Sequence, residues 1–551
     1  MQERSVKIER GWLHLPIRRS IDSRCYVKFL VDGKQFAELY LGLASDKPDF
    51  WCGMELEKYI GKTITMVLDD QGTEVPTGIL DGIVEGEAMD RNNPLYPDLY
   101  QEALRPQYHF TSRRGWMNDP NGLVFDGKNY HLYYQHNPYG ITHGGVNIHW
   151  GHAVSDDCLH WVERPDGIRP WVSNCHIASG SCIVDYDGVA GYGKGTIIAA
   201  FTHLGSINYR TLDETGAHPR CPSEGQYLAY STDGGNSFTL FPECPLIPTK
   251  DGQRWRDPRI FHDPEGGFGI AVYETTEKGN CVSFYHSDDL HSWERTSRAE
   301  DLFECPDLFK LTPINGGEDK WVLYGADGKY RIGDFAKGVF SDDGTRYCLD
   351  YGKGTYAGQT WTGCDDSNGR THICWLLADK TSWVEPSVFP DMGFSQQMTV
   401  PCLLKLVSTP EGYRLTRTPI PAVDSLHTGD KALLNIDTTR HAEIDLLLQG
   451  DMCLDISCEA PINILCGTAE ISYNPLTGEA VFDGGHRSGV LQKKGSLSLR
   501  VLTDTTSSEF FLQEEFSASY GQEMAGITLV IRSEKDFTIK GTVVAMMSIW
   551  H

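Results

Sequence analysis

The run Gly-Trp-Met-Asn-Asp-Pro-Asn-Gly at residues 115–122 sets one carboxylate between two amide side chains. Pro120 follows Asp119, fixes its own φ and donates no backbone hydrogen bond, so the carboxylate is held at a rigid strand end. Asn118 and Asn121 can hydrogen-bond a polyhydroxylated ligand. The run predicts a fixed nucleophilic carboxylate, and the competing interpretation is an ordinary Asx turn.

Two further acids precede prolines in similar settings. Asp257 follows Arg256, whose guanidinium favours the charged carboxylate and suits it to binding hydroxyls and steadying positive charge. Glu304 lies between Phe303 and Cys305, where loss of solvent favours the neutral form that can donate a proton. We predict Glu304 as a general acid/base and Asp257 as a stabilising group. A structural salt bridge and a solvated turn are the competing interpretations.

Composition excludes several classes of partner. The chain of 551 residues has 75 Asp plus Glu against 49 Lys plus Arg, a formal charge of −26 that repels nucleic acid and anionic membranes. It contains no apolar run of about 18 residues that could span a bilayer. The 16 cysteines are scattered singly without a CxxC pair, and residues 1–10 contain no apolar signal region. We therefore expect reduced thiols and a cytoplasmic protein.

The chain has the texture of an all-β protein. Short runs rich in β-branched and aromatic residues, bounded by Gly, Asp, Asn or Pro, predict strands at 130–135, 196–202 and 321–325. A Ser-Asp-Asp or Ser-Thr-Asp turn that leads into an aromatic recurs every 55 to 75 residues or so, which leaves room for four strands. The copies begin at Ser155, Ser231, Ser287 and Ser341. Four copies and one degenerate copy predict a five-bladed β-propeller.

The predicted organisation has four segments. They are a small N-terminal β-sandwich-like domain (1–100), the five-bladed β-propeller (101–415), a linker with a short helix (416–431) and a C-terminal β-sandwich (432–551). The N-terminal and C-terminal domains are assigned to β structure from alternating apolar residues, at 13–18, 26–31, 64–68, 444–448, 527–531 and 542–547.

Taken together, the motifs resemble glycoside hydrolase family 32, the β-fructofuranosidases. The resemblance covers about residues 105 to 545. Its segments are 108–110, 116–122, 134–138, 147–153, 159–161, 179–181, 256–258, 304–306, 356–360 and 504–511. The N-terminal unit is similar, more loosely, to the small β domain that precedes some bacterial members.

The resemblance implies a propeller followed by a sandwich, with fructose bound at the bottom of a funnel. Asp119 matches the family nucleophile, Glu304 the acid/base and Asp257 the stabiliser of the transition state. The residues that match the lining of the fructose pocket are Asn118, Gln135, Ser179 and Arg256. The implied reaction is retaining hydrolysis of terminal β-D-fructofuranosyl linkages in fructans, fructo-oligosaccharides or sucrose, without a metal or organic cofactor.

Departures from the family pattern fall around the pocket. His143 stands where members usually carry a tryptophan, in a loop (140–146) that is about two residues longer. Ala178 replaces a phenylalanine and Gly358 a proline, so we expect a changed pocket wall. A compensating aromatic could come instead from Trp171, Trp361 or Trp383. His149 and His152 complete no ligand motif, which favours hydrogen bonding in the core over a metal site.

Several alternatives stay open. We prefer exo release of fructose, but an endo-acting fructanase or a fructosyltransferase would use the same three acids. A non-catalytic fructan-binding protein and an inverting five-bladed glycosidase are rivals; only a retaining enzyme needs its two reacting carboxyl groups about 5 to 5.5 Å apart. The linkage preference, β-2,1 or β-2,6, the oligomeric state and the role of the N-terminal unit stay open too. For Trp12, Tyr40 and Trp51 we favour a place in the core over sugar stacking.

Overall fold

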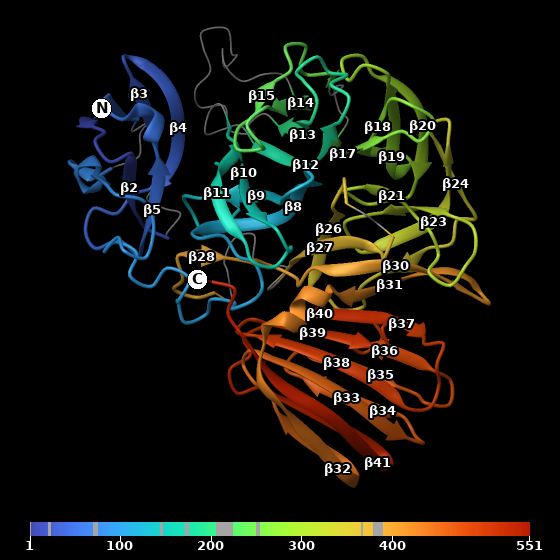
Figure 1. Cartoon of the computed structure of the whole chain (residues 1–551). Coiled ribbons are helices and arrows are strands. Elements are labelled where there is room, and N and C mark those ends of the chain that lie inside the picture. Colours follow the sequence, from blue (N-terminus) through green and yellow to red (C-terminus); the bar gives the residue numbers. More distant parts are fainter. Residues whose placement is uncertain are drawn as a thin grey trace.

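The computed structural model describes residues 2–19, 24–69, 75–143, 147–170, 176–204, 224–248, 254–364, 367–377 and 389–550. Nearly all of its regular structure is β. Figure 1 shows a small N-terminal β domain in blue, a ring of five sheets beside it, and a C-terminal sandwich in red. The predicted fold class is therefore confirmed. Within these ranges, no helix has the length and apolar character needed to cross a membrane.

Each propeller blade is an antiparallel sheet built from strands that follow one another along the chain. The first strands of the five blades are β8 (Gly115–Phe125), β12 (His176–Asp185), β17 (Arg254–His262), β21 (Asp307–Leu311) and β26 (Thr355–Thr360). Contacts join β8 to β12, β12 to β17, β17 to β21, and β26 back to β8. The first strands therefore line the centre of the ring.

The remaining strands complete the blades outward. Blade one adds β9 (Tyr130–Asn137), β10 (His149–Ser155) and β11 (Val162–Ile168), and blade two adds β13 (Thr196–Leu204), β14 (Gly225–Ser231), β15 (Thr239–Leu240) and β16 (Ile247–Pro248). Blade three adds β18 (Phe268–Thr276), β19 (Gly279–Ser287) and β20 (Glu294–Glu300). Blade four adds β22 (Lys320–Tyr324), β23 (Lys329–Ala336), β24 (Val339–Asp342) and β25 (Tyr347–Cys348). Blade five adds β27 (Arg370–Leu376), β29 (Gln397–Met398), β30 (Cys402–Thr409) and β31 (Gly412–Pro419), while β28 (Phe394–Ser395) pairs with β8.

Three copies of the Ser-Asp turn join the third and fourth strands of blades one to three. In each, the serine hydroxyl donates to the aspartate two residues later, at 2.9 Å in Ser155–Asp157, 2.7 Å in Ser231–Asp233 and 3.1 Å in Ser287–Asp289. The fourth copy differs, because Ser341 lies within β24 and its hydroxyl donates to the carbonyl of Asp334 at 3.4 Å. The four copies thus fall in four different blades, but the fourth lies at the end of β24 instead of between the third and fourth strands.

Two sheets form the N-terminal domain, in the orders β1-β6-β3-β4 and β5-β2-β7. Their bounds are β1 (Gln2–Lys7), β2 (Trp12–Ile17), β3 (Arg24–Val31), β4 (Lys34–Gly42), β5 (Phe50–Glu55), β6 (Thr63–Asp69) and β7 (Val84–Gly86), with the 3₁₀ helices η2 (Glu57–Tyr59) and η3 (Ile79–Gly82). The sheets enclose one apolar core, which also takes in Tyr139 and Ile141 from the propeller. Trp12 packs in a second cluster with Tyr96 and Leu99, which confirms its place in the core.

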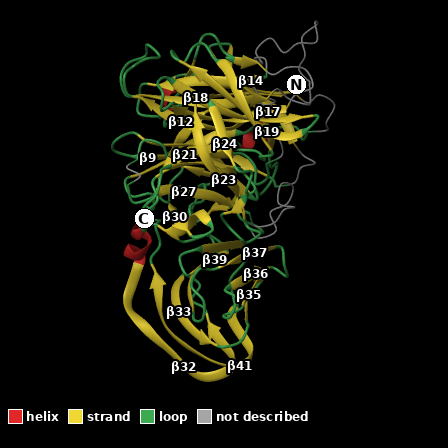
Figure 2. Ribbon diagram, turned by 90° about the vertical axis from the view of Figure 1, so that its right-hand side faces the viewer, coloured by secondary structure: helices red, strands yellow, loops and turns green. Residues whose placement is uncertain are grey.

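The C-terminal sandwich is wound around one long strand. Its strands are β32 (His427–Asp445), β33 (Gly450–Cys458), β34 (Ile462–Cys466), β35 (Ala469–Tyr473), β36 (Glu479–Phe482), β37 (Arg487–Val490), β38 (Leu497–Asp504), β39 (Ser507–Leu512), β40 (Phe516–Gly521) and β41 (Thr528–Met546). Residues 529–533 of β41 pair with β34, whereas residues 537–545 pair with β33. The strand therefore belongs to both layers, and Figure 2 shows β32 and β41 curving along the sandwich.

Two predictions for this region need correction. The runs 527–531 and 542–547 are two halves of β41, because the exposed polar residues 534–536 interrupt the apolar pattern where the strand passes between layers. The predicted linker 416–431 holds the end of β31, the 3₁₀ helix η4 (Pro421–Leu426) and the start of β32. The expected short helix is thus the whole connection between propeller and sandwich.

A buried group of charges joins the propeller to the sandwich. The His109 ring contacts Asp504 through Nδ1 at 2.9 Å and Glu509 through Nε2 at 3.0 Å. Arg417 contacts the same Glu509 at 3.3 Å and Asp350 at 3.2 Å. Burial alone would lower the pKa of His109, but hydrogen bonds to the two carboxylates raise it to about 9. The histidine is therefore a cation at neutral pH and stabilises the interface.

Stability is expected to fall as the pH rises through about 9. The unfolded histidine has a pKa near 6.5, so the contribution of His109 is complete below that pH and is lost as the folded group titrates. The difference between the folded and unfolded pKa of His109 contributes about 3 kcal/mol to the free energy of unfolding. Urea unfolding midpoints of the wild type and His109→Gln, followed from about pH 6 to pH 10, test this. An equal pH slope in both proteins would contradict it.

Candidate active site

Four of the five first strands change register, three of them where they carry a predicted site residue. The shifts lie between Met117 and Pro120, Ile177 and Gly180, Arg256 and Arg259, and Tyr356 and Gln359. A bulge of this kind frees one or two residues from the ladder and re-aims their side chains. Asp119, Ser179 and Asp257 all stand at such bulges, and each therefore points away from its own sheet.

Asp119 is held from both sides of its carboxylate. The Ser179 hydroxyl donates to Oδ2 at 2.7 Å, and the Asn118 amide donates to Oδ1 at 3.1 Å. Trp116 in turn donates from Nε1 to Asn118 Oδ1 at 2.8 Å and so fixes the direction of that amide. Burial raises the pKa of Asp119, the two hydrogen bonds lower it, and the nearby charge of Glu304 raises it again.

Cys305 connects two of the predicted acids. Its backbone N–H donates to Asp257 Oδ2 at 3.2 Å, and its Sγ lies 3.6 Å from Asp119 Oδ2. Asp257 is fixed further by its own N–H, which donates to Thr202 Oγ1 at 2.9 Å. Asp119 and Asp257 are 9% and 6% exposed, so both carboxylates are buried.

Glu304 is bound by a cation and a phenol. Arg256 donates from Nη2 to one carboxylate oxygen, and the Tyr356 hydroxyl donates to the other. Arg256 Nε also lies 3.6 Å from Asp257 Oδ2, so one guanidinium bridges two of the acids. The Glu304 side chain is 20% exposed, more than the other two carboxylates. Its partners are thus polar, unlike the apolar setting expected from Phe303.

The backbone is strained at these acids. Asp257, Glu304, Cys305 and Ala357 adopt φ values of +62°, +45°, +37° and +50°. Side chains other than glycine rarely adopt this region, and each such residue costs about 1 to 3 kcal/mol. Strain of this kind persists where surrounding structure imposes it, and it clusters at functional sites. Holding these residues in place therefore lowers the stability of the fold.

Arg256 favours the charged form of Asp257, as predicted, but burial has the larger effect on its pKa. Burial raises the pKa of Asp257 to about 7, and the charges of Glu304 and Asp119 act in the same direction. Arg256 lowers this pKa, but it divides its charge between Asp257 and Glu304. Loss of solvent is the larger effect because the carboxylate is fully enclosed.

Gln135 lies on β9, the strand paired with β8, and two other groups hold its amide. His176 Nε2 donates to Gln135 Oε1 at 3.1 Å, and Gln135 Nε2 donates to the Ile177 carbonyl at 2.8 Å. The His143 ring lies 5.1 Å from that of His176 and edge-on to Trp116 at 6.4 Å. The two imidazoles therefore stand beside the predicted pocket residues.

The structure also places the proposed replacements for the missing tryptophan. Trp361 is fully buried, stacks on Trp161 at 6.1 Å and donates to the His131 carbonyl, so it belongs to the core. Trp171 and Trp383 lie outside the described residues. His149 and His152 hydrogen-bond inside the propeller, to the Asn147 carbonyl and to His131, as expected for core histidines.

Direct contacts thus bring six predicted residues together in two groups of three, which Cys305 connects. One group is Asn118, Asp119 and Ser179, and the other is Arg256, Asp257 and Glu304. Gln135 is held apart from them by His176 and Ile177. Sequence reasoning gave no role to Tyr356, Cys305 or His176. Tyr356 lies in a matched segment, but its contact with Glu304 depends on how two blades meet, and no spacing in the chain encodes that.

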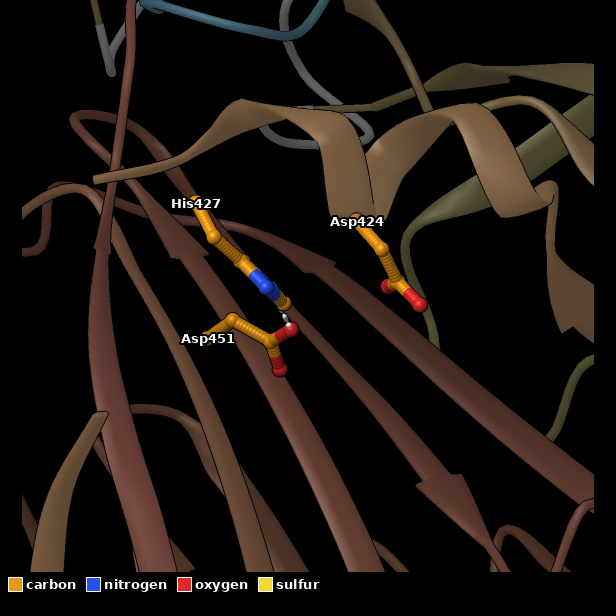
Figure 3. Close-up of side chains that lie close together, drawn as sticks. All are labelled: Asp424, His427 and Asp451. Atoms are coloured by element: carbon orange, nitrogen blue, oxygen red, sulfur yellow. Dashed lines mark hydrogen bonds and ion pairs between the residues drawn. The ribbon is translucent and has the colours of Figure 1, made fainter. Parts of the chain in front are cut away.

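A second cluster of polar side chains lies between η4 and the sandwich. Figure 3 shows His427 pointing at Asp451, with Asp424 beside them. His427 Nε2 contacts Asp451 at 2.7 Å, while the Arg500 guanidinium contacts Asp424 at 2.5 Å and Asp451 at 2.7 Å. Arg500 already pairs with both carboxylates. The cluster is therefore an ion-pair network at the linking helix.

Comparison with known proteins assigns the propeller domain to a family. The family model "Glycosyl hydrolases family 32 N-terminal domain" matches residues 109–419, more than half of the chain. A levanase of Bacillus subtilis (strain 168) is 30% identical over 409 residues, which cover 70% of this chain and 56% of the levanase. An invertase of Wickerhamomyces anomalus is 30% identical over 381 residues, covering 63% and 65%. The chain thus spans less than two thirds of the length of these relatives.

A solved structure of similar shape extends the match to the sandwich. The exo-inulinase from Aspergillus awamori has a TM-score of 0.69 and 24% identity, and the alignment covers 82% of this chain and all of the inulinase chain. At this identity the likeness concerns the fold alone. The match of the family model, together with the motifs and their placement on the propeller, leads to one conclusion: the chain belongs to glycosyl hydrolase family 32.

Proposed function

We propose that the protein is a retaining β-fructosidase that releases fructose from the ends of fructans, fructo-oligosaccharides or sucrose. The observation that carries the proposal is the meeting of three carboxylates from three blades around Cys305 and Arg256. Retaining glycosidases need a nucleophilic carboxylate and a second carboxyl group that gives and then takes a proton. Asp119 and Glu304 suit these two tasks.

The proposed reaction has two steps. In the first, Asp119 attacks the anomeric C2 while Glu304 gives its proton to the departing oxygen, so that a fructosyl ester forms on Asp119. In the second, the Glu304 carboxylate takes a proton from water, and the resulting hydroxide displaces Asp119 from C2. The products are fructose and the shortened alcohol, and both carboxyl groups return to their starting states.

The neighbouring residues serve these steps by position. Ser179 and Asn118 hold the Asp119 carboxylate in one orientation, which keeps its attacking oxygen aligned. Arg256 and Tyr356 do the same for Glu304. Asp257 is proposed to bind fructose hydroxyls and to offset the positive charge that develops at C2.

The names of the relatives support the substrate class. They are called levanases, invertases and exo-inulinases, and one solved structure of similar fold is titled as a β-fructofuranosidase complexed with fructosyl-erythritol. Exo action is proposed because the carboxylates of Asp119 and Asp257 are nearly closed from solvent, which suits a chain end better than the middle of a polymer. The partner class is therefore a neutral, fructose-containing carbohydrate.

The experiment that tests this function is a product profile. Purified protein is incubated with sucrose, inulin and levan, and the products are separated by chromatography over time. We expect fructose from the first time points. The polymer that is hydrolysed faster then gives the preferred linkage. Early oligosaccharides would replace it with an endo-acting enzyme or a transferase. Inactivity on all three substrates would favour a fructan-binding protein.

The pH dependence of kcat/KM is expected to rise up to about pH 7. The value reports the free enzyme, in which Asp257 has a pKa of about 7 and must be ionised to stabilise the transition state. Arg256→Gln removes the charge that lowers this pKa, so the rise should move to a pH higher by about one or more. Arg440→Gln, an exposed ion-pair variant, is the control. A profile that keeps its position in Arg256→Gln would contradict the assignment.

A further inference from the structure

The loop that follows β9 is anchored in the N-terminal domain. Tyr139 and Ile141 are buried in that domain's apolar core, among residues of both of its sheets. Arg24, at the start of β3, donates from Nη2 to the Thr142 hydroxyl at 3.4 Å. The residue after Thr142 is His143. The N-terminal domain therefore fixes residues 139–142, immediately before His143, the residue that departs from the family pattern.

A second grip lies on the far side of the loop. The Asn147 amide donates from Nδ2 to the Tyr40 carbonyl at 2.9 Å and accepts from the Tyr40 N–H at 3.1 Å. This pair of bonds copies the backbone pairing between two strands, although one partner is a side chain. Asn147 adopts φ +55°, a conformation that asparagine tolerates better than most residues. Both described ends of the loop are thus fixed by the same domain.

The His143 ring contacts two residues that hold side chains of the predicted fructose pocket. The first is Trp116, which lies edge-on to His143 and donates a hydrogen bond to Asn118, the partner of Asp119. The second is His176, whose ring centre lies 5.1 Å from that of His143 and which donates to Gln135. A shift of His143 would therefore disturb both sides of the pocket.

We infer that the N-terminal domain shapes the sugar pocket from outside it, because it positions His143 against Trp116 and His176 and thereby selects among fructosides. The inference rests on the proposed β-fructosidase function. Burial lowers the pKa of both imidazoles, so both are neutral at neutral pH. A neutral imidazole offers one donor and one acceptor, and His176 already donates to Gln135. The other nitrogen of His176 is an acceptor, which suits a ligand rich in hydroxyls beyond the fructose, namely a second sugar unit.

Asn147→Gly is the sharpest test. Glycine accepts the φ of +55° without strain and removes both hydrogen bonds to Tyr40. Asn147→Asp keeps the acceptor for the Tyr40 N–H and loses the donor, so it should act in between. Ser5→Ala removes an exposed hydrogen bond to Thr65 in the same domain, far from the loop, and is the matched control.

Two measurements are made on the full-length variants. The first is kcat and KM for sucrose and for inulin. Asn147→Gly should raise at least one KM by about tenfold and change the ratio of kcat/KM between the substrates, with kcat altered by less than about twofold. The second is hydrogen–deuterium exchange of peptides that cover residues 130–143 and 176–182. Exchange should increase in Asn147→Gly, less in Asn147→Asp, and not in Ser5→Ala.

The two readouts separate the inference from the function on which it rests. If the wild type hydrolyses fructosides and Asn147→Gly keeps its KM values and their ratio, the domain does not select substrates. If exchange of both segments is unchanged in Asn147→Gly, the domain does not position His143, whatever the activity. A wild type without activity on any fructoside would remove the proposed function, and with it the selecting role of the loop.

Discussion

Replacing Asp119 with asparagine is expected to lower kcat for sucrose or inulin by about 10⁴-fold or more. The change keeps the shape of the side chain but removes the carboxylate that forms the bond to C2, so the covalent step has no nucleophile. KM should change little, because the groups proposed to bind fructose stay in place. Initial rates over a range of substrate concentrations, with circular dichroism to check the fold, give the answer.

The matched control for this result is Ser179→Ala. It removes one hydrogen bond to the Asp119 carboxylate, at 2.7 Å, and leaves the carboxylate itself. A loss of about tenfold in kcat is expected from one hydrogen bond to a charged group. Equal and small losses in the two variants would mean that Asp119 is not the nucleophile, and the proposed mechanism would fall.

The second large effect concerns stability. Asp307→Asn is expected to lower the free energy of unfolding by about 3 to 5 kcal/mol, because it removes the carboxylate that pairs with the fully buried Arg259. The two side chains meet at 2.9 Å, and Arg259 also donates to the Thr360 carbonyl at 3.2 Å. Asp307 accepts from the Thr360 N–H and hydroxyl, at 2.8 Å each. One ion pair thus ties together the first strands of blades three, four and five.

Urea unfolding of Asp307→Asn measures this effect through the shift in the transition midpoint. Asp536→Asn is the control, since its ion pair with Arg440 joins side chains that are 54% and 67% exposed. Exposed pairs contribute about 1 kcal/mol or less. If both variants unfolded at the same urea concentration, the central ion pair would not stabilise the ring.

The fold could be predicted largely because its strands are short and punctuated by turn residues. The predicted strands at 130–135 and 196–202 lie within β9 and β13, and the strand at 321–325 ends one residue beyond β22. The pattern failed for β41, which a polar stretch divides in the sequence although the strand continues in space. Period-two patterning reports burial, and burial changes where one strand passes between two layers.

The candidate site shows the same limit. Asp119, Asp257 and Glu304 could be singled out from their neighbours along the chain, because a proline follows each of them within two residues and restricts the local backbone. The raised pKa of Asp257 could not, since it depends on enclosure by parts of the chain that are distant in sequence. Nor could the contact of Tyr356 with Glu304, or the support that Tyr40 gives to the His143 loop. These contacts arise where blades and domains meet.

The most direct test of the proposed mechanism is the stereochemistry of transfer to methanol. Hydrolysis of sucrose in buffer with methanol diverts part of the fructosyl ester to methyl fructoside, whose anomeric centre is stable and can be assigned by NMR. Two displacements at C2 predict methyl β-D-fructofuranoside alone. Methyl α-D-fructofuranoside as the product would show a single displacement with inversion and would contradict a covalent intermediate on Asp119.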